Sequence, residues 1–80
     1  MGFSVYLQSG KIKKKISDMN DNDSVQKLID KLKNKINSKK IILCIFESKA
    51  LDPKLTLGFY GIKRHDVIQY SENYKGGNLF

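Results

Sequence analysis

The chain has 80 residues, of which 15 are Lys or Arg and 8 are Asp or Glu, so its formal net charge is +7. This length leaves room for one small domain, and the many β-branched and aromatic residues argue against a disordered chain. The single cysteine, Cys44, excludes an internal disulfide, and with the single histidine, His65, it cannot complete a four-ligand zinc site. We therefore expect neither a metal nor another cofactor.

The first 16 residues predict a β-hairpin. Met1 to Leu7 alternates between apolar and polar residues, as a half-buried strand does, and Gly10 suits a turn that requires a positive φ. Lys11 to Ile16 then forms the returning strand. Lys14 falls on the apolar side of that strand, so it must lie at a sheet edge or extend its ammonium group to water.

A helix is expected after a polar connection over residues 17–23. Asp23, followed three positions later by Gln26, is typical of a capping box that begins a helix. Apolar residues then recur with helical spacing at Val25, Leu28, Ile29, Leu32 and Ile36. The helix should end in the segment from Asn37 to Lys40, after lysines that favour the negative end of its dipole.

Ile41 to Phe46 is an unbroken apolar run, which predicts a central strand. Alternation places Ile42, Cys44 and Phe46 on one face and Ile41, Leu43 and Ile45 on the other. A single helix covers only one face of a sheet. The second face would therefore expose an apolar patch, which is a feature of partner-binding surfaces.

The remainder predicts a turn region around Pro53, an irregular segment and a last strand from Asp66 to Ser71. Five apolar residues of the irregular segment are expected to anchor it to the core: Leu55, Leu57, Phe59, Tyr60 and Ile62. We expect a domain over residues 1–72 and a flexible tail over residues 73–80.

The order of hairpin, helix, strand, irregular segment and strand resembles that of ubiquitin and its relatives. Individual residues add to the resemblance: Gly10-Lys11 at the hairpin turn, Ser24-Val25 at the start of the helix, Ile45-Phe46, Lys49, Leu51, Thr56-Leu57, Tyr60, Ile62, Ile68 and Gly76-Gly77. The resemblance implies an α+β fold of the β-grasp type, with a mixed sheet of four to five strands packed on one helix.

Members of this family that modify other proteins are joined to them through a C-terminal diglycine. Gly76 and Gly77 stand at the corresponding spacing from the last strand, so Gly77 would become the conjugation terminus after removal of Asn78 to Phe80. Glu72 to Lys75 differs from the apolar, arginine-rich segment of ubiquitin, which argues against ubiquitin's own enzymes. A diglycine is also common in a linker that leads into a longer chain.

The alternative implied by the resemblance is a non-covalent ubiquitin-like domain of an adaptor or shuttle protein, which binds pathway enzymes or proteasomal receptors. The recognition patch of ubiquitin corresponds to Gln8, Ile45, Gln69 and Ser71, of which Ile45 alone is apolar. We therefore expect a relocated protein-binding patch on the same face, formed by Tyr6, Leu43, Ile45 and Val67 beside Gln69 and bordered by Lys49.

Nucleic-acid binding is a third reading, because one ubiquitin-like splicing factor contacts RNA. However, Arg64 is the only arginine, and the residues after Gly77 carry no basic cluster. We expect protein partners with acidic surfaces rather than nucleic acid. No catalytic constellation is evident, since His65 has no nucleophile near it in the sequence, so we do not expect an enzyme.

Two further expectations concern the environment of the protein. No apolar run approaches the roughly 18 residues of a membrane span, and the first 20 residues lack the pattern of a signal peptide. We therefore expect a protein of the cytoplasm, the nucleus or both, without a membrane partner. We also expect it to be a monomer.

Overall fold

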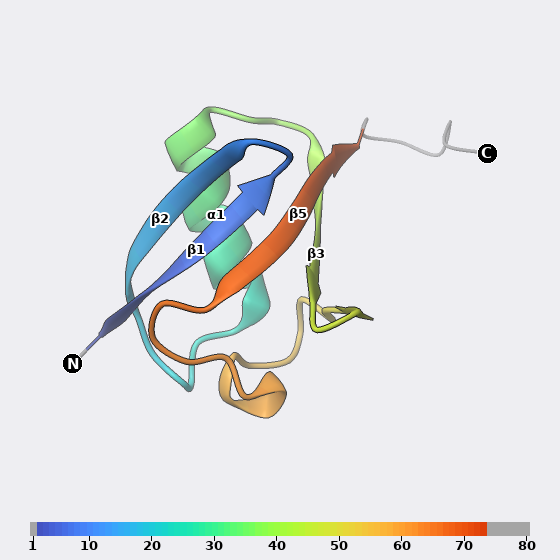
Figure 1. Ribbon diagram of the computed structural model, residues 1–80. Coiled ribbons are helices and arrows are strands. Elements are labelled where there is room, and N and C mark those ends of the chain that lie inside the picture. The colour runs from blue at the N-terminus through green and yellow to red at the C-terminus, as the bar shows by residue number, and fades with distance from the viewer. Residues whose placement is uncertain (1, 74–80) are drawn as a thin grey trace.

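A computed structural model describes residues 2–73 of the chain. Along these residues a hairpin is followed by a helix, a third strand, a short strand, one turn of 3-10 helix and a last strand (Figure 1). The elements are β1 (Phe3–Ser9), β2 (Ile12–Met19), α1 (Val25–Ile36), β3 (Ile41–Phe46), β4 (Lys49–Ala50), the 3-10 helix (Gly58–Tyr60) and β5 (Val67–Asn73). The expected α+β organisation, with five strands and one helix, is confirmed.

The strands form one mixed sheet in the order β2-β1-β5-β3-β4. β1 and β5 run parallel in its middle, whereas the β1–β2, β3–β5 and β3–β4 pairs are antiparallel. β5 is the middle strand, and β3 is an interior strand as expected, although β4 pairs only with its last two residues. α1 lies behind the sheet in the view of Figure 1 and covers one of its faces.

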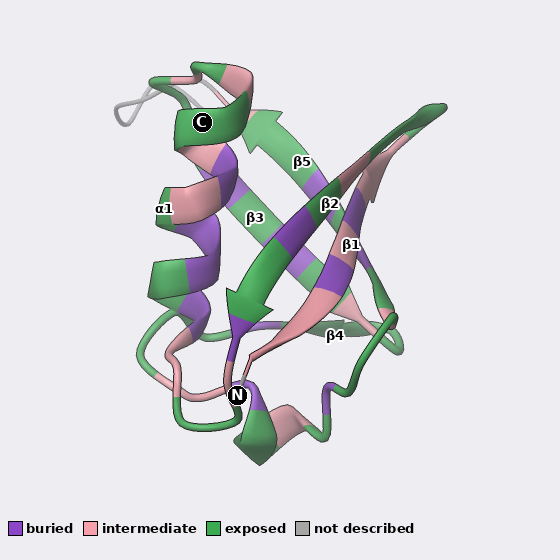
Figure 2. Ribbon diagram, turned by 90° about the vertical axis from the view of Figure 1, so that its left-hand side faces the viewer, coloured by how far each residue is buried: buried purple, intermediate pink, exposed green. Residues whose placement is uncertain are grey.

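The core lies between α1 and this covered face (Figure 2). Its largest fully buried side chains are Leu7, Met19, Leu28, Leu32, Leu57, Ile62, Ile68, Val5 and Val25. No polar or charged residue is buried in the described part of the chain. The alternation expected for β1 and β3 is confirmed, because Val5 and Cys44 point into the core, and Ile68 of β5 does the same.

The second strand is longer than the sequence predicts. The register pairs Val5 with Ile16 but Phe3 with Met19, so the one residue between them on β1 lies opposite two residues of β2. Asp18, whose φ is +63°, lies within this β-bulge. The extra residue reverses the alternation, and Met19 is therefore fully buried rather than part of a polar connection. Lys14 is half-buried on this edge strand, as expected.

The start of the helix also differs from the prediction. Ser24 is the N-cap, and its hydroxyl oxygen accepts a hydrogen bond of 3.1 Å from the backbone N–H of Lys27. The carboxylate of Asp23 instead accepts from the backbone N–H of Asn20 at 2.9 Å, while the Gln26 amide donates to Asp30. The capping box predicted for Asp23 and Gln26 is therefore not formed. Asn37 ends the helix in the left-handed conformation, within the expected segment.

The irregular segment is joined to the start of α1 by backbone hydrogen bonds. Carbonyl oxygens of Leu55 and Pro53 accept from the first two backbone N–H groups of the helix, at 2.8 and 3.0 Å. The Gly58 N–H donates to Asp21 at 2.9 Å, and a Cβ at this glycine would lie 3.2 Å from the same oxygen, so the close approach favours glycine. Leu57 is a buried anchor as expected, but Phe59 is 68% exposed, which corrects its expected role.

Candidate functional site

The candidate site is the face of the sheet opposite α1, which the viewer faces in Figure 1. No other element of residues 2–73 covers it in Figures 1 and 2. Three apolar side chains on this face are substantially exposed: Leu43 by 52%, Ile45 by 43% and Val67 by 36%. Together with Tyr6 they form the open-face patch, and Ile41 continues it along β3 with 39% exposure.

Strand pairing fixes how these residues lie relative to one another. Tyr6 on β1 is paired with Val67 on β5, so their side chains are direct neighbours. Ile45 on β3 pairs with Gln69, two residues beyond Val67 on the same face, and therefore lies diagonally across from Val67. Leu43 pairs with Ser71. The fold thus brings together Tyr6, Leu43, Ile45 and Val67 from three strands that are distant in sequence.

Gln69 lies in the middle of this group. It pairs with Ile45 on one side and with Gln8 on the other, and its side chain is exposed. The open-face patch is therefore not uniformly apolar, because a free amide lies among its aliphatic residues. An amide both donates and accepts hydrogen bonds, so a partner that buries the patch must satisfy it.

Two basic residues that the sequence did not assign to the site contact Tyr6. The Lys13 ammonium lies 5.4 Å from the centre of the Tyr6 ring, at a distance suited to a cation–π contact. The His65 ring centre is 6.2 Å from that of Tyr6, and the His65 backbone N–H donates to the Ser4 carbonyl at 2.7 Å. Alternation along the hairpin could have identified Lys13, but no local pattern places His65 beside β1.

Lys49 lies on the edge strand β4, outside the rows of the open-face patch. The register pairs Lys49 with Phe46, which belongs to the core face, whereas Ala50 is the residue opposite Ile45. Lys49 is exposed, next to a turn in which Glu47 and Ser48 both have positive φ. Its role at the border stays a prediction.

The remaining titratable groups give the site little reactive chemistry. Burial raises the pKa of the Cys44 thiol to about 12, and its side chain points into the core. Burial raises the pKa of Tyr70, and repulsion from Glu72 raises it further by a smaller amount. Within residues 2–73, no three His, Cys, Asp or Glu side chains gather where they could hold a metal ion, and no helix is long and apolar enough to cross a membrane.

Gly76 and Gly77 lie outside the described residues, as does the tail from residue 74 onward. The conjugation terminus and the flexibility expected for this tail therefore stay predictions. β5 itself continues to Asn73.

Comparisons with known proteins identify the fold. Neither the models of protein families nor the curated protein sequences match the chain. Among solved structures, an N-terminal ubiquitin-like domain of the 4931431F19Rik protein matches with a TM-score of 0.81 and 14% identity, over 99% of this chain and 82% of that one. A protein designed on the basis of ubiquitin gives 0.81 and 15%, over 98% and 96%.

The chain has the ubiquitin-like β-grasp fold. A third match, to the structure described as ATBAG1 in complex with HSP70, has a TM-score of 0.80 and 18% identity over 89% of this chain, which spans 40% of that longer chain. A fourth, from a structure described as molecular mimicry of SUMO in DNA repair, gives 0.75 and 19% over 88% of this chain and 90% of that one. At these identities the likeness establishes the ubiquitin-like fold, which confirms the resemblance read from the sequence.

Proposed function

We propose that this ubiquitin-like chain recognises partner proteins through its open-face patch and is not itself a catalyst. The observation that carries the proposal is the exposure of Leu43, Ile45 and Val67 on one uncovered sheet face. The sheet does not need these side chains for its core, because the opposite face already packs against α1. Exposed apolar groups that converge from several strands can supply the anchors of a protein interface.

The surroundings of the patch favour an acidic partner. Lys13 and Lys15 lie on the open face of β2, next to Gln8 and Tyr6, and the chain has a net charge of +7. Positive charge around an apolar centre steers acidic surfaces toward it and disfavours basic ones. The Gln69 amide adds a requirement for a hydrogen-bonding group opposite the centre of the patch.

Substitution of Ile45 tests this proposal. The Ile45→Ala chain should capture fewer proteins from an extract of its own cells, because truncation removes an anchor at the centre of the patch. Phe59→Ala is the control, since Phe59 is also apolar and exposed but lies on the 3-10 helix away from the sheet face. Captured proteins are identified by mass spectrometry, and urea unfolding verifies that both variants fold.

The expected result is a set of proteins lost with Ile45→Ala and retained with Phe59→Ala, with both variants folded. Capture that is unchanged by Ile45→Ala would remove the open face as the recognition surface. Equal losses with both variants would contradict it as well, because general surface hydrophobicity would then explain the capture.

A finer proposal is that recognition serves covalent attachment through Gly77. It rests on the sequence of Gly76 and Gly77, and the alternative is a domain that docks without conjugation inside a larger adaptor or shuttle protein. Mass spectrometry of the protein from its own cells distinguishes them. A modifier should end at Gly77 and form higher-mass adducts that disappear with Gly77→Ala. If all recovered chains retain Asn78 to Phe80 and no adduct depends on Gly77, conjugation is excluded.

A further inference from the structure

The open face of the sheet has two chemically different halves. The half formed by β3 and β5 carries the exposed aliphatic side chains, whereas the half formed by β1 and β2 is polar. The alternation that buries Val5, Leu7 and Ile16 turns six other side chains of these two strands to the open face: Ser4, Tyr6, Gln8, Lys13, Lys15 and Ser17. Each of the six can donate a hydrogen bond, and none is acidic.

Two lysines of this polar half lie beside the Tyr6 ring. Lys15 is the residue of β2 that pairs with Tyr6, and Lys13 pairs with Gln8 one step further along the same face. Both lysines are exposed. The Lys13 ammonium lies 5.4 Å from the centre of the Tyr6 ring, and this attraction holds it over the sheet. The β2 side of Tyr6 is therefore cationic.

His65 reaches the same ring from the turn before β5, the strand on the other side of β1. Its backbone has a φ of +68°, which L-residues rarely adopt, and its N–H donates to the Ser4 carbonyl at 2.7 Å. These constraints place the His65 ring centre 6.2 Å from that of Tyr6. Tyr6, Lys13, Lys15 and His65 together form the donor corner of the open face.

The acidic residues next in sequence to this corner have their carboxylates placed elsewhere. The carboxylate of Asp66 accepts a hydrogen bond of 2.7 Å from the backbone N–H of Lys63. The carboxylate of Asp18 lies beside Gly2, where it would meet an added Cβ. An anion that enters the donor corner therefore meets two ammonium groups without competition from these carboxylates.

We propose that the donor corner binds a phosphate group on a segment of the partner protein, while aliphatic side chains of the same segment pack on Leu43, Ile45 and Val67. The inference rests on the proposed function, because it names the partner of the open-face patch as a phosphorylated one. A phosphate ester carries a charge of about −1.5 to −2 and three strong acceptor oxygens, whereas a carboxylate carries one charge. Two ammonium groups, a phenol and an imidazole match the phosphate better.

A nucleic acid fits this face less well than a phosphorylated peptide. Single strands present a row of phosphates, and their bases stack on aromatic rings. The donor corner is one compact group, and the surface next to it is aliphatic rather than aromatic. A peptide with one phosphate and a short apolar stretch uses both halves of the face.

The strand register sets the distance between the two halves. One row across four neighbouring strands consists of Lys13, Gln8, Gln69 and Ile45. Neighbouring strands lie about 4.8 Å apart, so about 14 Å separates the two ends of this row. An extended segment that crosses the strands covers this distance with about four residues. We therefore expect the phosphate about four residues from the aliphatic anchor.

Fluorescence anisotropy with the full chain tests this inference. The probes are labelled peptides in which a phosphoserine follows a Leu-Val-Leu segment at spacings from about two to about eight residues. Their controls carry serine or glutamate in place of the phosphoserine. At the expected spacing, the phosphorylated peptide should bind about tenfold more tightly than the serine peptide, and the glutamate peptide should gain less.

Substitutions in the two halves should have different effects. Lys13→Gln combined with Lys15→Gln should abolish the gain from the phosphate. Lys39→Gln combined with Lys54→Gln makes the same change in net charge at exposed positions outside the strands, and it should retain the gain. Ile45→Ala should weaken the phosphorylated and serine peptides by the same factor. If Ile45→Ala changed neither affinity, the open-face proposal would fail, whereas this inference fails through the phosphate effect.

Several outcomes would overturn the inference. Equal affinity for the phosphorylated and serine peptides, or no binding by any phosphorylated peptide, would remove the phosphate site. Equal losses in the two double variants would show attraction by net charge alone. A glutamate peptide that binds as tightly as the phosphorylated one would show that a carboxylate suffices. Tighter binding of a single-stranded oligonucleotide of matched charge would indicate a nucleic-acid surface instead.

Discussion

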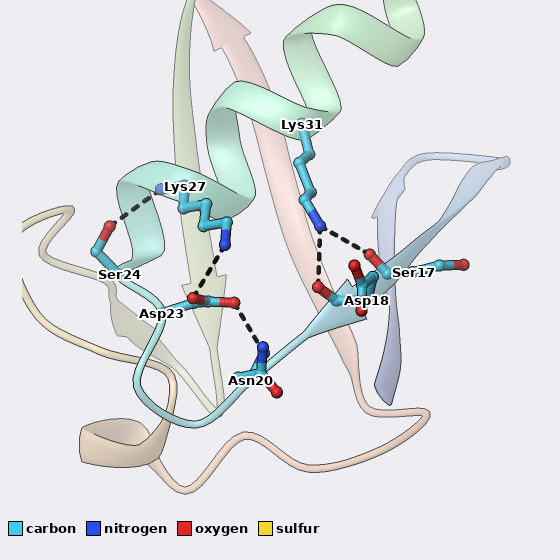
Figure 3. A network of polar contacts seen from close by, with 7 residues as sticks. All are labelled: Ser17, Asp18, Asn20, Asp23, Ser24, Lys27 and Lys31. Carbon is cyan, nitrogen blue, oxygen red and sulfur yellow. Dashed lines mark hydrogen bonds and ion pairs between the residues drawn. The ribbon is translucent and has the colours of Figure 1, made fainter. Parts of the chain in front are cut away.

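Asp23 shows how one carboxylate joins the turn after β2 to the first turns of α1. It accepts a hydrogen bond from the Asn20 backbone N–H and forms an ion pair of 3.2 Å with Lys27 (Figure 3). The backbone hydrogen bond is the main reason why the pKa of Asp23 lies below its ordinary value of 3.8, and the Lys27 ammonium lowers it further. Burial acts in the opposite direction but does not outweigh these contacts.

This shift predicts that stability depends on the ionisation of Asp23. A carboxyl whose pKa is lower in the folded state stabilises the fold above the unfolded-state pKa, and that stabilisation is lost as pH falls through the folded-state pKa. Asp23→Asn should therefore lower the free energy of unfolding by about 1 kcal/mol at pH 7. Urea unfolding at several pH values should show the difference between the two proteins shrink as pH falls below 3.8 and vanish below the folded-state pKa. A difference that persists unchanged in acid would contradict this assignment.

At the scale of single elements, the sequence predicts periodicity well and local geometry less well. The faces of β1, β3 and β5 follow alternation, and the stripe of α1 follows helical spacing, because burial on one face imposes both. The bulge at Asp18 could not be predicted, since nothing in the sequence of β2 requires an extra residue there. The N-cap could not be predicted either, because Asp23 and Ser24 both suit that position. In the structure the carboxylate of Asp23 accepts a hydrogen bond from Asn20 in the turn before the helix, so it does not cap α1.

Ser24 therefore carries the capping interaction of α1. Ser24→Ala removes the acceptor of the Lys27 N–H and should lower the free energy of unfolding by about 1 kcal/mol. Ser24→Asp is the matched control, because its carboxylate can accept the same hydrogen bond, and it should remain within a few tenths of a kcal/mol of wild type. Chemical unfolding measures both changes. If Ser24→Asp were as destabilising as Ser24→Ala, the loss would not arise from the cap.

At the scale of the whole molecule, the candidate site is more predictable than its surroundings. Tyr6, Leu43, Ile45 and Val67 were expected on one face because each follows the alternation of its own strand, and the β-grasp order brings those strands together. His65 was missed because its contact with Tyr6 depends on the parallel pairing of β1 and β5. That pairing joins residues about 60 positions apart, and no local pattern reports it.

The parallel pairing of β1 and β5 also makes the fold depend on the irregular segment between β4 and β5, because this segment leads the chain into β5. A domain of this size is expected to have a free energy of unfolding of only about 4 to 12 kcal/mol. Leu57 is fully buried, and its backbone N–H donates to the Asp23 carbonyl at 2.9 Å, so it joins this segment to the start of α1. Leu57→Ala should cost about 2 to 5 kcal/mol, a large fraction of the total.

Phe59 provides the comparison because it lies two residues away in the same segment and is 68% exposed. Phe59→Ala should change the free energy of unfolding by less than about 0.5 kcal/mol. Urea denaturation followed by circular dichroism measures both variants. If Phe59→Ala destabilised the fold as much as Leu57→Ala, the segment would be packed differently, with Phe59 turned inward. A large effect confined to Leu57 would establish that this segment, although irregular, is part of the single core on which the sheet and its open face depend.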